Sequence, residues 1–251
     1  MERRGLKPIR LFSSDLDGTL AGDTKAARRF AAFWQKIEPE NRPLLVYNSG
    51  RLVDDVLRFA AEQGLPDADF IIGGVGTMLH GAAEPELADH YHLNIGAGYD
   101  VEKINALLAG IEALQYQPER YQHERKSSWY LHEATPEQLL SIENALLDQG
   151  LAVKLVYSSK RDLDILPARA DKGQALTWLC RQLAVHLDEV VVAGDTGNDL
   201  EMFTLSTVRG IVPANGLDEL TALAKDNPLI YRARKPEADG VIEGLKHWMA
   251  P

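Results

Sequence analysis

Two aspartates follow the first predicted strand of the chain at a spacing that suits metal-assisted chemistry. Ile9–Ser14 is a short β-prone run, and Asp15 and Asp17 come directly after it. Alternation places both carboxyls on the same side, at the carboxyl end of the strand, where open α/β sheets bind their ligands. Two carboxyls this close repel each other unless a cation lies between them, and a few oxygen ligands suit Mg²⁺. An ordinary turn after a strand is the alternative for this pair alone.

Ser49 and Lys172 each stand at the beginning of a predicted helix, where an anion can bind. Ser49 follows the apolar run Pro43–Tyr47. Its hydroxyl and the free N–H groups of the next helix would form a seat for phosphate, or would simply cap that helix. Lys172 lies in a first helical turn, where the helix dipole disfavours a cation. A nearby anion would explain that position, and an exposed lysine is the alternative.

The segment Gly194–Asp199 follows another strongly apolar run, Glu189–Ala193. It holds two carboxyls, one amide and two glycines within six residues, so its backbone can approach a ligand closely. Because the preceding run predicts a buried strand, Asp195 and Asp199 should lie at the mouth of the sheet. We therefore expect one site that is built from four separate segments.

Short apolar runs alternate with helical segments at both ends of the chain, and this alternation predicts βαβ units and a parallel sheet. Between about residues 80 and 169 the pattern changes to two helices and three strands with antiparallel neighbours. The last two of these strands are predicted to form a hairpin that turns at Ser158–Arg161. We expect an α/β core of residues 1–79 and 170–251, interrupted by an inserted α+β cap at residues 80–169.

Composition limits the possible partners and the compartment. The 251 residues carry a formal net charge of −10, which argues against a nucleic-acid or anionic-membrane surface. The single Cys180 allows no internal disulfide, and no apolar run approaches the length of a membrane span. We therefore expect a cytoplasmic protein.

The four segments together resemble the motifs of the haloacid dehalogenase superfamily of phosphatases, and the insertion resembles the C2B cap of that superfamily. The resemblance covers the whole chain and implies a Rossmann-like parallel-sheet core. It implies that Asp15 is the nucleophile and Asp17 the general acid/base, and that Asp199 orders the loop behind the metal. The phosphate-binding residues would be Ser49, Gly50, Lys172 and Asn198. The Mg²⁺ ligands would be Asp15, Asp17 and Asp195.

The chemistry of these residue types agrees with the implied roles. A carboxylate can accept a phosphoryl group as an aspartyl-phosphate. Phosphoryl transfer depends mainly on positioning and charge neutralisation, which Mg²⁺ and Lys172 would supply. Asp17 could protonate the leaving alkoxide and then activate water.

Four segments look like the sucrose-phosphate phosphatase family and, within it, like the bacterial mannosylfructose-phosphate phosphatases. They are Val46–Arg51, Gly73–Thr77, Ser158–Pro167 and Gly194–Asp199. This likeness implies hydrolysis of mannosylfructose-phosphate or sucrose-6-phosphate, disaccharides that carry their phosphate on fructose. The chain departs from sucrose phosphatases at Gly18 and Ser49, where Asn and Thr are frequent. Sucrose specificity is therefore not implied.

The core motifs recognise only phosphate and metal, so sugar selection should come from polar residues of the cap. The candidates are Lys126, Ser128, Ser158, Asp162 and Asp164. Trp129 would supply an aromatic face for the sugar, although packing in a core is the alternative. Two other activities share all the motifs: a sugar phosphomutase or phosphotransferase, and a broad-range sugar-phosphate phosphatase. A phosphosugar-binding protein without activity is disfavoured because Asp15 and Asp17 are both present.

Overall fold

The computed structural model describes residues 6–225 and 227–250, and its larger part is a seven-stranded sheet. The strands are β1 (Leu11–Ser14), β2 (Leu44–Asn48), β3 (Phe70–Gly73), β4 (Met78–Gly81), β9 (Val190–Ala193), β10 (Arg209–Val212) and β11 (Ile230–Arg232). Their order is β11-β10-β9-β1-β2-β3-β4, and only the edge strand β4 runs antiparallel to its neighbour. The first strand of the chain, β1, thus lies at the centre, between β2 and β9.

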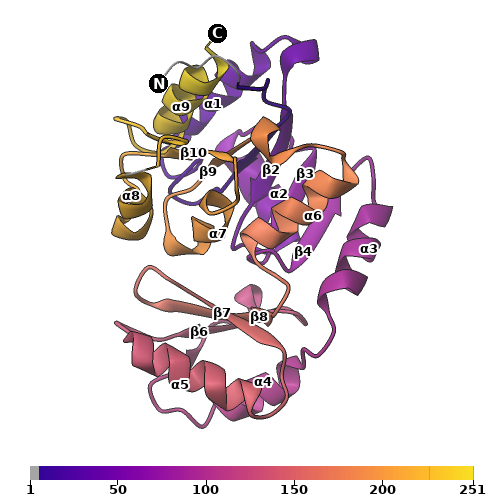
Figure 1. Cartoon of the computed structure of the whole chain (residues 1–251), viewed down its shortest axis with the longest axis vertical. Coiled ribbons are helices and arrows are strands. Elements are labelled where there is room, and N and C mark those ends of the chain that lie inside the picture. The colour runs from indigo at the N-terminus through magenta and orange to yellow at the C-terminus, as the bar shows by residue number, and fades with distance from the viewer. Residues whose placement is uncertain (1–5, 226, 251) are drawn as a thin grey trace.

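Helices cover both faces of this sheet (Figure 1). One face packs against α1 (Thr24–Gln35), α2 (Val53–Gln63) and α9 (Glu237–Met249). The other packs against α3 (Glu86–Ile95), α6 (Lys172–Gln182), α7 (Leu200–Phe203) and α8 (Asp218–Lys225). Successive residues of β1 serve opposite faces, since Leu11 packs in one apolar cluster and Phe12 in the other. A strand that is buried on both faces is apolar at successive positions, which explains the continuous apolar runs.

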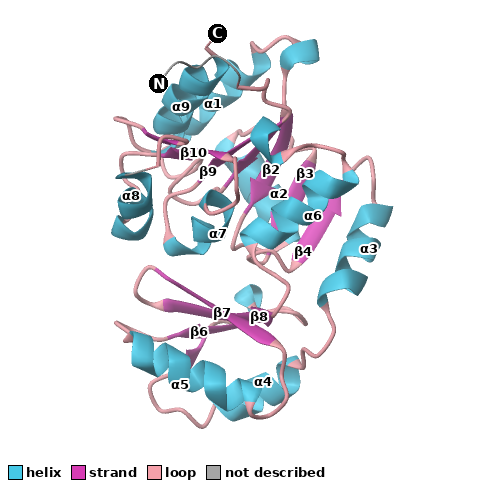
Figure 2. Ribbon diagram, viewed as in Figure 1, coloured by secondary structure: helices cyan, strands magenta, loops and turns pink. Residues whose placement is uncertain are grey.

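A second, antiparallel sheet forms the smaller part of the molecule. Its strands are β5 (Gln115–Tyr116), β6 (Ser127–Tyr130), β7 (Val153–Ser158) and β8 (Asp162–Pro167), in the order β5-β6-β8-β7. Figure 2 shows α4 (Val101–Leu108) and α5 (Pro136–Leu147) on the side of this sheet that is away from the core. Between sheet and helices lies a separate apolar cluster that includes Ile104, Trp129 and Leu163. The expected hairpin turn lies between β7 and β8.

Short 3₁₀ helices complete the fold at η1 (Pro39–Asn41), η2 (Glu119–Tyr121), η3 (Leu187–Glu189) and η4 (Gly197–Asp199). Among the described residues, no helix has the length and apolar content that a membrane crossing requires. The expected α/β core with an inserted α+β cap is confirmed.

The pairing of β4 and the packing of α3 bear on the expected start of the cap at residue 80, which stays a prediction. β4 pairs with β3 in the core sheet, and Leu87 and Tyr91 of α3 pack in the same apolar cluster as α6. These elements escaped the sequence analysis because β4 is a short edge strand that follows a glycine-rich turn. We propose that the cap comprises the segment from α4 to β8.

Candidate active site

The four predicted segments meet at one edge of the core sheet because their strands are neighbours. β1 pairs in parallel with both β2 and β9, so the segments that follow these strands emerge side by side. The backbone N–H of Asp15 donates to the carbonyl of Ala193 at 2.9 Å, and the N–H of Ser49 donates to Ile72 at 2.8 Å. The central sheet thus brings together residues that lie far apart in the chain.

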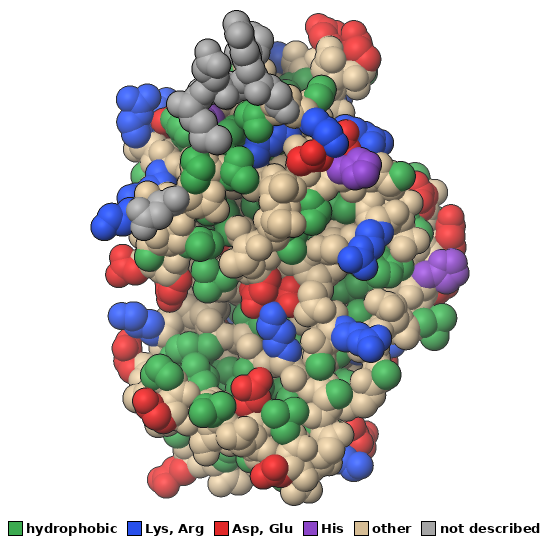
Figure 3. Space-filling model, viewed as in Figure 1, with side chains coloured by type: hydrophobic (Ala, Val, Ile, Leu, Met, Phe, Trp, Pro, Cys, Tyr) green, Lys and Arg blue, Asp and Glu red, His purple; other side chains and the backbone are tan. Residues whose placement is uncertain are grey.

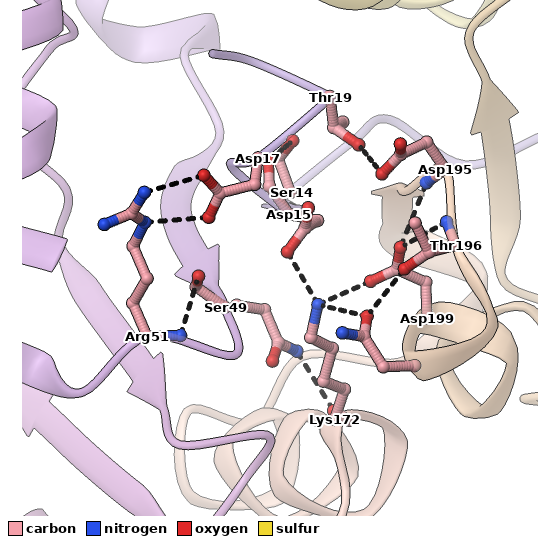
Figure 4. A network of polar contacts seen from close by, with 12 residues as sticks. Ser14, Asp15, Asp17, Thr19, Ser49, Arg51, Lys172, Asp195, Thr196 and Asp199 are labelled. Carbon is pink, nitrogen blue, oxygen red and sulfur yellow. Dashed lines mark hydrogen bonds and ion pairs between the residues drawn. The ribbon is translucent and has the colours of Figure 1, made fainter. Parts of the chain in front are cut away.

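Lys172 is the centre of the site (Figure 4). Its Nζ lies 2.6 Å from Asp15 Oδ1, 2.6 Å from Asp199 Oδ1 and 2.9 Å from Asn198 Oδ1. These three contacts use all the donors of an ammonium group. Lys172 is fully buried, and burial alone would lower its pKa, but the ion pairs with Asp15 and Asp199 outweigh burial and raise it. The lysine therefore stays charged and is not the exposed lysine of the alternative interpretation.

Asp199 organises the loop after β9. Its Oδ2 accepts hydrogen bonds from the backbone N–H groups of Asp195 at 3.0 Å and Thr196 at 3.1 Å, while its Oδ1 faces Lys172. Both of its oxygens are thus engaged with the protein. This geometry fits a residue that shapes the loop better than one that binds a ligand directly.

Asp15 and Asp195 each have a carboxyl oxygen that remains available to a ligand. One oxygen of Asp15 is engaged by Lys172, and Asp195 Oδ1 accepts from the Thr19 hydroxyl at 3.1 Å. No donor from the described chain reaches the other oxygen of either residue. Oxygens of Asp15, Asp195 and Asp199 lie within 4.8 Å of one another.

The electrostatics of these two acids favour a cation between them. Burial raises the pKa of Asp15 well above its ordinary value; Lys172 opposes this rise, and the charges of Asp199 and Asp195 add to it. Burial, followed by the charge of Asp199, raises the pKa of Asp195 to about 7. A divalent cation would offset this concentration of negative charge, and carboxylate oxygens are the ligands that Mg²⁺ prefers. The donor set therefore fits Mg²⁺.

Asp17 lies at the mouth of the site and is held by an arginine. Its side chain is 54% exposed, and Arg51 donates to its two oxygens, from Nε at 2.7 Å and from Nη2 at 2.8 Å. Arg51 also pairs with Asp55 at 2.7 Å and stacks on Phe59, with 3.7 Å between the guanidinium carbon and the ring centroid. The sequence analysis missed Arg51, although an arginine two residues after Ser49 and four before an aspartate was a visible signal.

Ser49 and Gly50 shape the turn between β2 and α2. The Ser49 hydroxyl accepts the backbone N–H of Arg51 at 3.2 Å, and Ser49 is fully buried. Gly50 lines the cavity described below, and a β-carbon on it would lie 3.7 Å from Asn198 Nδ2. Gly50 and Asn198 thus face each other above Lys172, while the Ser49 hydroxyl serves the turn in this structure.

A cavity of about 310 Å³ separates these groups from the cap. The core lines it with Asp15, Asp17, Gly50, Arg51, Thr196 and Asn198. The cap lines it with Gln117, Tyr121, Lys126, Tyr130, Ser158, Ser159, Arg161, Asp162 and Asp164. Its volume lies at the lower end of the range of small-molecule sites, about 300–1,000 Å³. The cavity therefore lies between a charged floor, formed by these core residues, and a polar roof, formed by these cap residues.

The five cap residues expected to recognise a sugar lie close together in this roof or just behind it. Lys126 is buried and pairs with Asp164 Oδ1 at 2.8 Å. Ser128 donates to the same oxygen at 2.6 Å and supports the pair from behind the cavity wall. Asp162 Oδ1 accepts from Gln117 Nε2 at 3.1 Å, and Ser158 lines the cavity beside it.

Comparison with known proteins identifies the family. A family model described as sucrose-6F-phosphate phosphohydrolase matches residues 8–249. The chain belongs to this family. It is 53% identical over 243 residues to a mannosylfructose-phosphate phosphatase from Agrobacterium fabrum. The aligned residues make up 97% of this chain and 98% of that protein.

Solved structures agree with the family and with the fold. The sucrose-phosphatase from Synechocystis sp. PCC6803, solved with sucrose and phosphate, superposes with a TM-score of 0.86 at 27% identity over 96% of this chain and 98% of the other. A sugar phosphatase of HAD subclass IIB superposes with a TM-score of 0.66 at 13% identity, over 96% and 99% of the two chains. The second likeness concerns the fold alone. The expected haloacid dehalogenase-like fold is confirmed.

In this member of the sucrose-6F-phosphate phosphohydrolase family, Trp129 does not line the cavity, so the expectation of an aromatic sugar platform there is wrong. Trp129 is 3% exposed and packs in the apolar cluster between the cap sheet and its helices. Alternation along β6 explains the error, because Ser128 and Tyr130 face the core while Trp129 faces the helices. The aromatic residues at the cavity are Tyr121 and Tyr130, which the sequence analysis missed.

Proposed function

We propose that this chain is a Mg²⁺-dependent phosphatase that hydrolyses a disaccharide phosphate with its phosphate on fructose, mannosylfructose-phosphate or sucrose-6-phosphate. The observation that carries the proposal is the fully buried Lys172, which joins Asp199 to Asp15, a residue that lines a cavity with a polar roof. The activities named for the family and for the Agrobacterium relative support the substrate class. The single cysteine, Cys180, is free and buried, which supports a reducing compartment such as the cytoplasm.

Asp15 is the nucleophile in this proposal. Its free oxygen attacks phosphorus, the bond from phosphorus to the sugar oxygen breaks, and an aspartyl-phosphate forms on Asp15. Asp17, which lies at the mouth of the site and would leave Arg51 and become protonated for this step, gives a proton to the departing sugar oxygen. Asp17 then takes a proton from water, whose oxygen attacks phosphorus and releases inorganic phosphate with the Asp15 carboxylate restored.

The remaining core residues hold the phosphate group and its charge. Lys172 neutralises negative charge beside Asp15, and Gly50 and Asn198 face each other across the mouth of the site. Mg²⁺ would be held by Asp15, Asp195 and the backbone carbonyl of Asp17, and when bound it would neutralise charge on the nucleophile and on the transferring group. Asp199 keeps the loop of Asp195 in place through its two backbone hydrogen bonds.

The cap supplies sugar selection because its side of the cavity is rich in groups that can hydrogen-bond to hydroxyls. Lys126, Asp162 and Asp164 have their positions set by other cap residues, so they present a fixed pattern to the ligand. Such pre-organisation favours one arrangement of hydroxyls over others. A sugar phosphate with a single ring would leave part of this roof without partners.

The substrate proposal predicts a strong preference for disaccharide phosphates. We expect kcat/KM for mannosylfructose-phosphate or sucrose-6-phosphate to exceed that for glucose 6-phosphate and fructose 6-phosphate by about 100-fold or more, since the second sugar completes the contacts with the roof. Phosphate release across this panel measures the preference. Equal turnover of monosaccharide phosphates would contradict the substrate assignment. Isomerised sugar phosphate without released phosphate would indicate a phosphomutase.

Variants of the cap sharpen this test. We expect Lys126→Ala and Asp162→Ala to lower kcat/KM for the disaccharide about tenfold or more, with p-nitrophenyl phosphate nearly unaffected. Asp148→Ala serves as the control, because Asp148 is an exposed residue that follows α5 on the far side of the cap. Equal losses on all esters would argue against a role of the two residues in sugar recognition.

The metal proposal predicts a specific effect of a methyl group at Gly18. Gly18 has a φ of +76°, and a β-carbon on it would lie 2.3 Å from Asp195 Oδ2. We therefore expect Gly18→Ala to displace the Asp195 carboxyl and to raise the Mg²⁺ concentration for half-maximal activity about tenfold or more. The left-handed backbone conformation should also lower the free energy of unfolding of this variant by about 1–2 kcal/mol. Titration of EDTA-treated enzyme with MgCl₂ measures this shift.

Gly150→Ala is the matched control for backbone strain. Gly150 has a similar φ of +74°, and apart from its chain neighbours no heavy atom of the described residues lies within 4 Å of the position of its β-carbon. This variant should lose comparable stability and keep the Mg²⁺ requirement of the native chain. Full activity of EDTA-treated native enzyme would overturn the metal proposal, and so would an unchanged Mg²⁺ titration of Gly18→Ala.

A further inference from the structure

Lys154 makes the only side-chain ion pairs between cap and core in the described parts of the chain. It lies on β7, an edge strand of the cap sheet. Its Nζ reaches 2.6 Å from Asp171 Oδ2 and 3.0 Å from Glu201 Oε1, both of which belong to the core. Figure 3 shows acidic and basic side chains together at the level where the two parts of the molecule meet.

Both partners of Lys154 stand next to residues of the site. Asp171 directly precedes Lys172 and caps α6, accepting from the backbone N–H of Gln174 at 2.6 Å. Glu201 lies at the beginning of α7, two residues after Asp199. One lysine of the cap is thus tied to α6, which carries Lys172, and to α7, which directly follows Asp199.

The two acids depend on this lysine to different degrees. Asp171 is 2% exposed and also accepts from the Gln174 side chain at 2.7 Å, so it keeps other partners. Glu201 forms no other ion pair among the described residues, and its Oε2 is buried without a hydrogen-bond donor there. Burial disfavours the charged amine, but the hydrogen bond with Asp171 and the charge of Glu201 raise the pKa of Lys154. The pair therefore persists at neutral pH.

The same strand passes from this contact to the active site. The backbone of β7 runs close to η4, where a β-carbon on Gly197 would lie 3.2 Å from the carbonyl oxygen of Tyr157. Ser158, the last residue of β7, lines the cavity. A shift of β7 at Lys154 would therefore move the roof of the cavity relative to its floor.

We propose that Lys154 is a positioning residue that sets the distance and orientation of the sugar-binding roof over Asp15 through its ion pairs with Asp171 and Glu201. This role rests on the proposed phosphatase function. The reaction on phosphate itself needs only the core groups, and Asp171 still caps α6 through Gln174 when Lys154 is replaced. The ion pairs therefore serve substrates that contact both cap and core.

Lys154→Met tests the proposal because it removes the charge and keeps most of the length of the side chain. We expect KM for the disaccharide phosphate to rise about tenfold, with a change below about twofold in kcat/KM for p-nitrophenyl phosphate. The matched control is Lys103→Met, which removes an exposed lysine that pairs at 3.7 Å with Asp100 inside the cap. The control should leave both substrates unaffected.

Glu201→Gln provides a second variant in case Lys154→Met folds poorly, since it keeps the shape and removes the charge. The double variant should show no larger rise in KM than Lys154→Met alone, because both changes break the same contact. Limited trypsin digestion gives a readout without substrate. Arg169 is an exposed trypsin site in the linker between β8 and α6, and its cleavage should accelerate in both variants.

The outcomes separate this proposal from the proposed function. Equal losses on disaccharide phosphate and p-nitrophenyl phosphate would overturn the positioning role, and so would native KM values with native cleavage at Arg169. Additive effects of the two substitutions would also overturn it. If the native enzyme releases no phosphate from any ester, the proposed function fails, and the trypsin experiment still decides whether Lys154 holds the cap in place.

Discussion

Asp15→Asn should lower kcat for the sugar phosphate by about 10³-fold or more while the protein stays folded. The amide is nearly isosteric with the carboxylate, but its oxygen is a poor nucleophile and cannot form the aspartyl-phosphate. Lys172 keeps Asp199 and Asn198 as partners in this variant. The loss would therefore report on chemistry and not on a collapsed site.

The stability of this variant should be equal to or higher than that of the native protein at neutral pH. Burial and the neighbouring carboxyls raise the pKa of Asp15, which means that its charged form is held at a cost in folding free energy. Charged groups that an active site needs often lower the stability of the folded protein in this way. Thermal unfolding without metal, measured beside phosphate release, checks both expectations.

Asp54→Asn is a suitable control, because Asp54 is an exposed acid in the first turn of α2. It should retain native activity. Mass spectrometry of acid-quenched enzyme should find a phosphoryl group on the peptide that contains Asp15 in the native protein and none in Asp15→Asn. Substantial phosphatase activity in the Asp15 variant would falsify the assignment of the nucleophile.

Lys172→Met should damage both activity and stability. The amine is fully buried and pairs with two acids at 2.6 Å. Its removal leaves Asp15 and Asp199 without their counter-ion, and breaking a buried ion pair in this way costs about 3–5 kcal/mol. We expect a loss of stability of that size together with a fall in kcat of about 10³-fold, since charge on the transferring group also loses its neutralising partner.

Urea unfolding in EDTA measures the stability part of this prediction, and phosphate release at saturating Mg²⁺ measures the activity part. Lys36→Met is the control, because Lys36 is exposed and forms no ion pair within the described chain. It should change neither quantity by more than about 0.5 kcal/mol or twofold. A Lys172 variant with native stability would show that another group neutralises the charge of the buried Asp15 and Asp199.

Local sequence patterns were enough to place the residues of the core site on particular strands and helices. Each segment of the site follows an apolar run or begins a helix, and the structure brings Asp15 and Asn198 within hydrogen-bonding distance of the Lys172 amine. The inserted cap was visible as a change from alternating strands and helices to antiparallel neighbours. These features depend on periodicity and on residue type, which can be read from a short stretch of the sequence.

Other features depend on contacts between distant segments, and sequence patterns did not reveal them. The placement of α3 with the core was missed because its apolar residues acquire a partner only when α6 folds beside them. The bidentate pairing of Arg51 with Asp17 joins residues that are 34 positions apart. Neither local composition nor spacing specifies which acid an arginine will meet.

The sequence by itself determined the α/β core, the inserted cap and the segments that carry Asp15, Lys172 and Asp195. It did so because buried parallel strands require continuous apolar runs and because ligand-binding segments follow such strands. Only the tertiary structure decided that Lys172 would be fully buried among acids and that Trp129 would face the helices of the cap. Burial and ion pairing arise from the packing of helices and loops against each sheet, and that packing is a property of the whole folded chain.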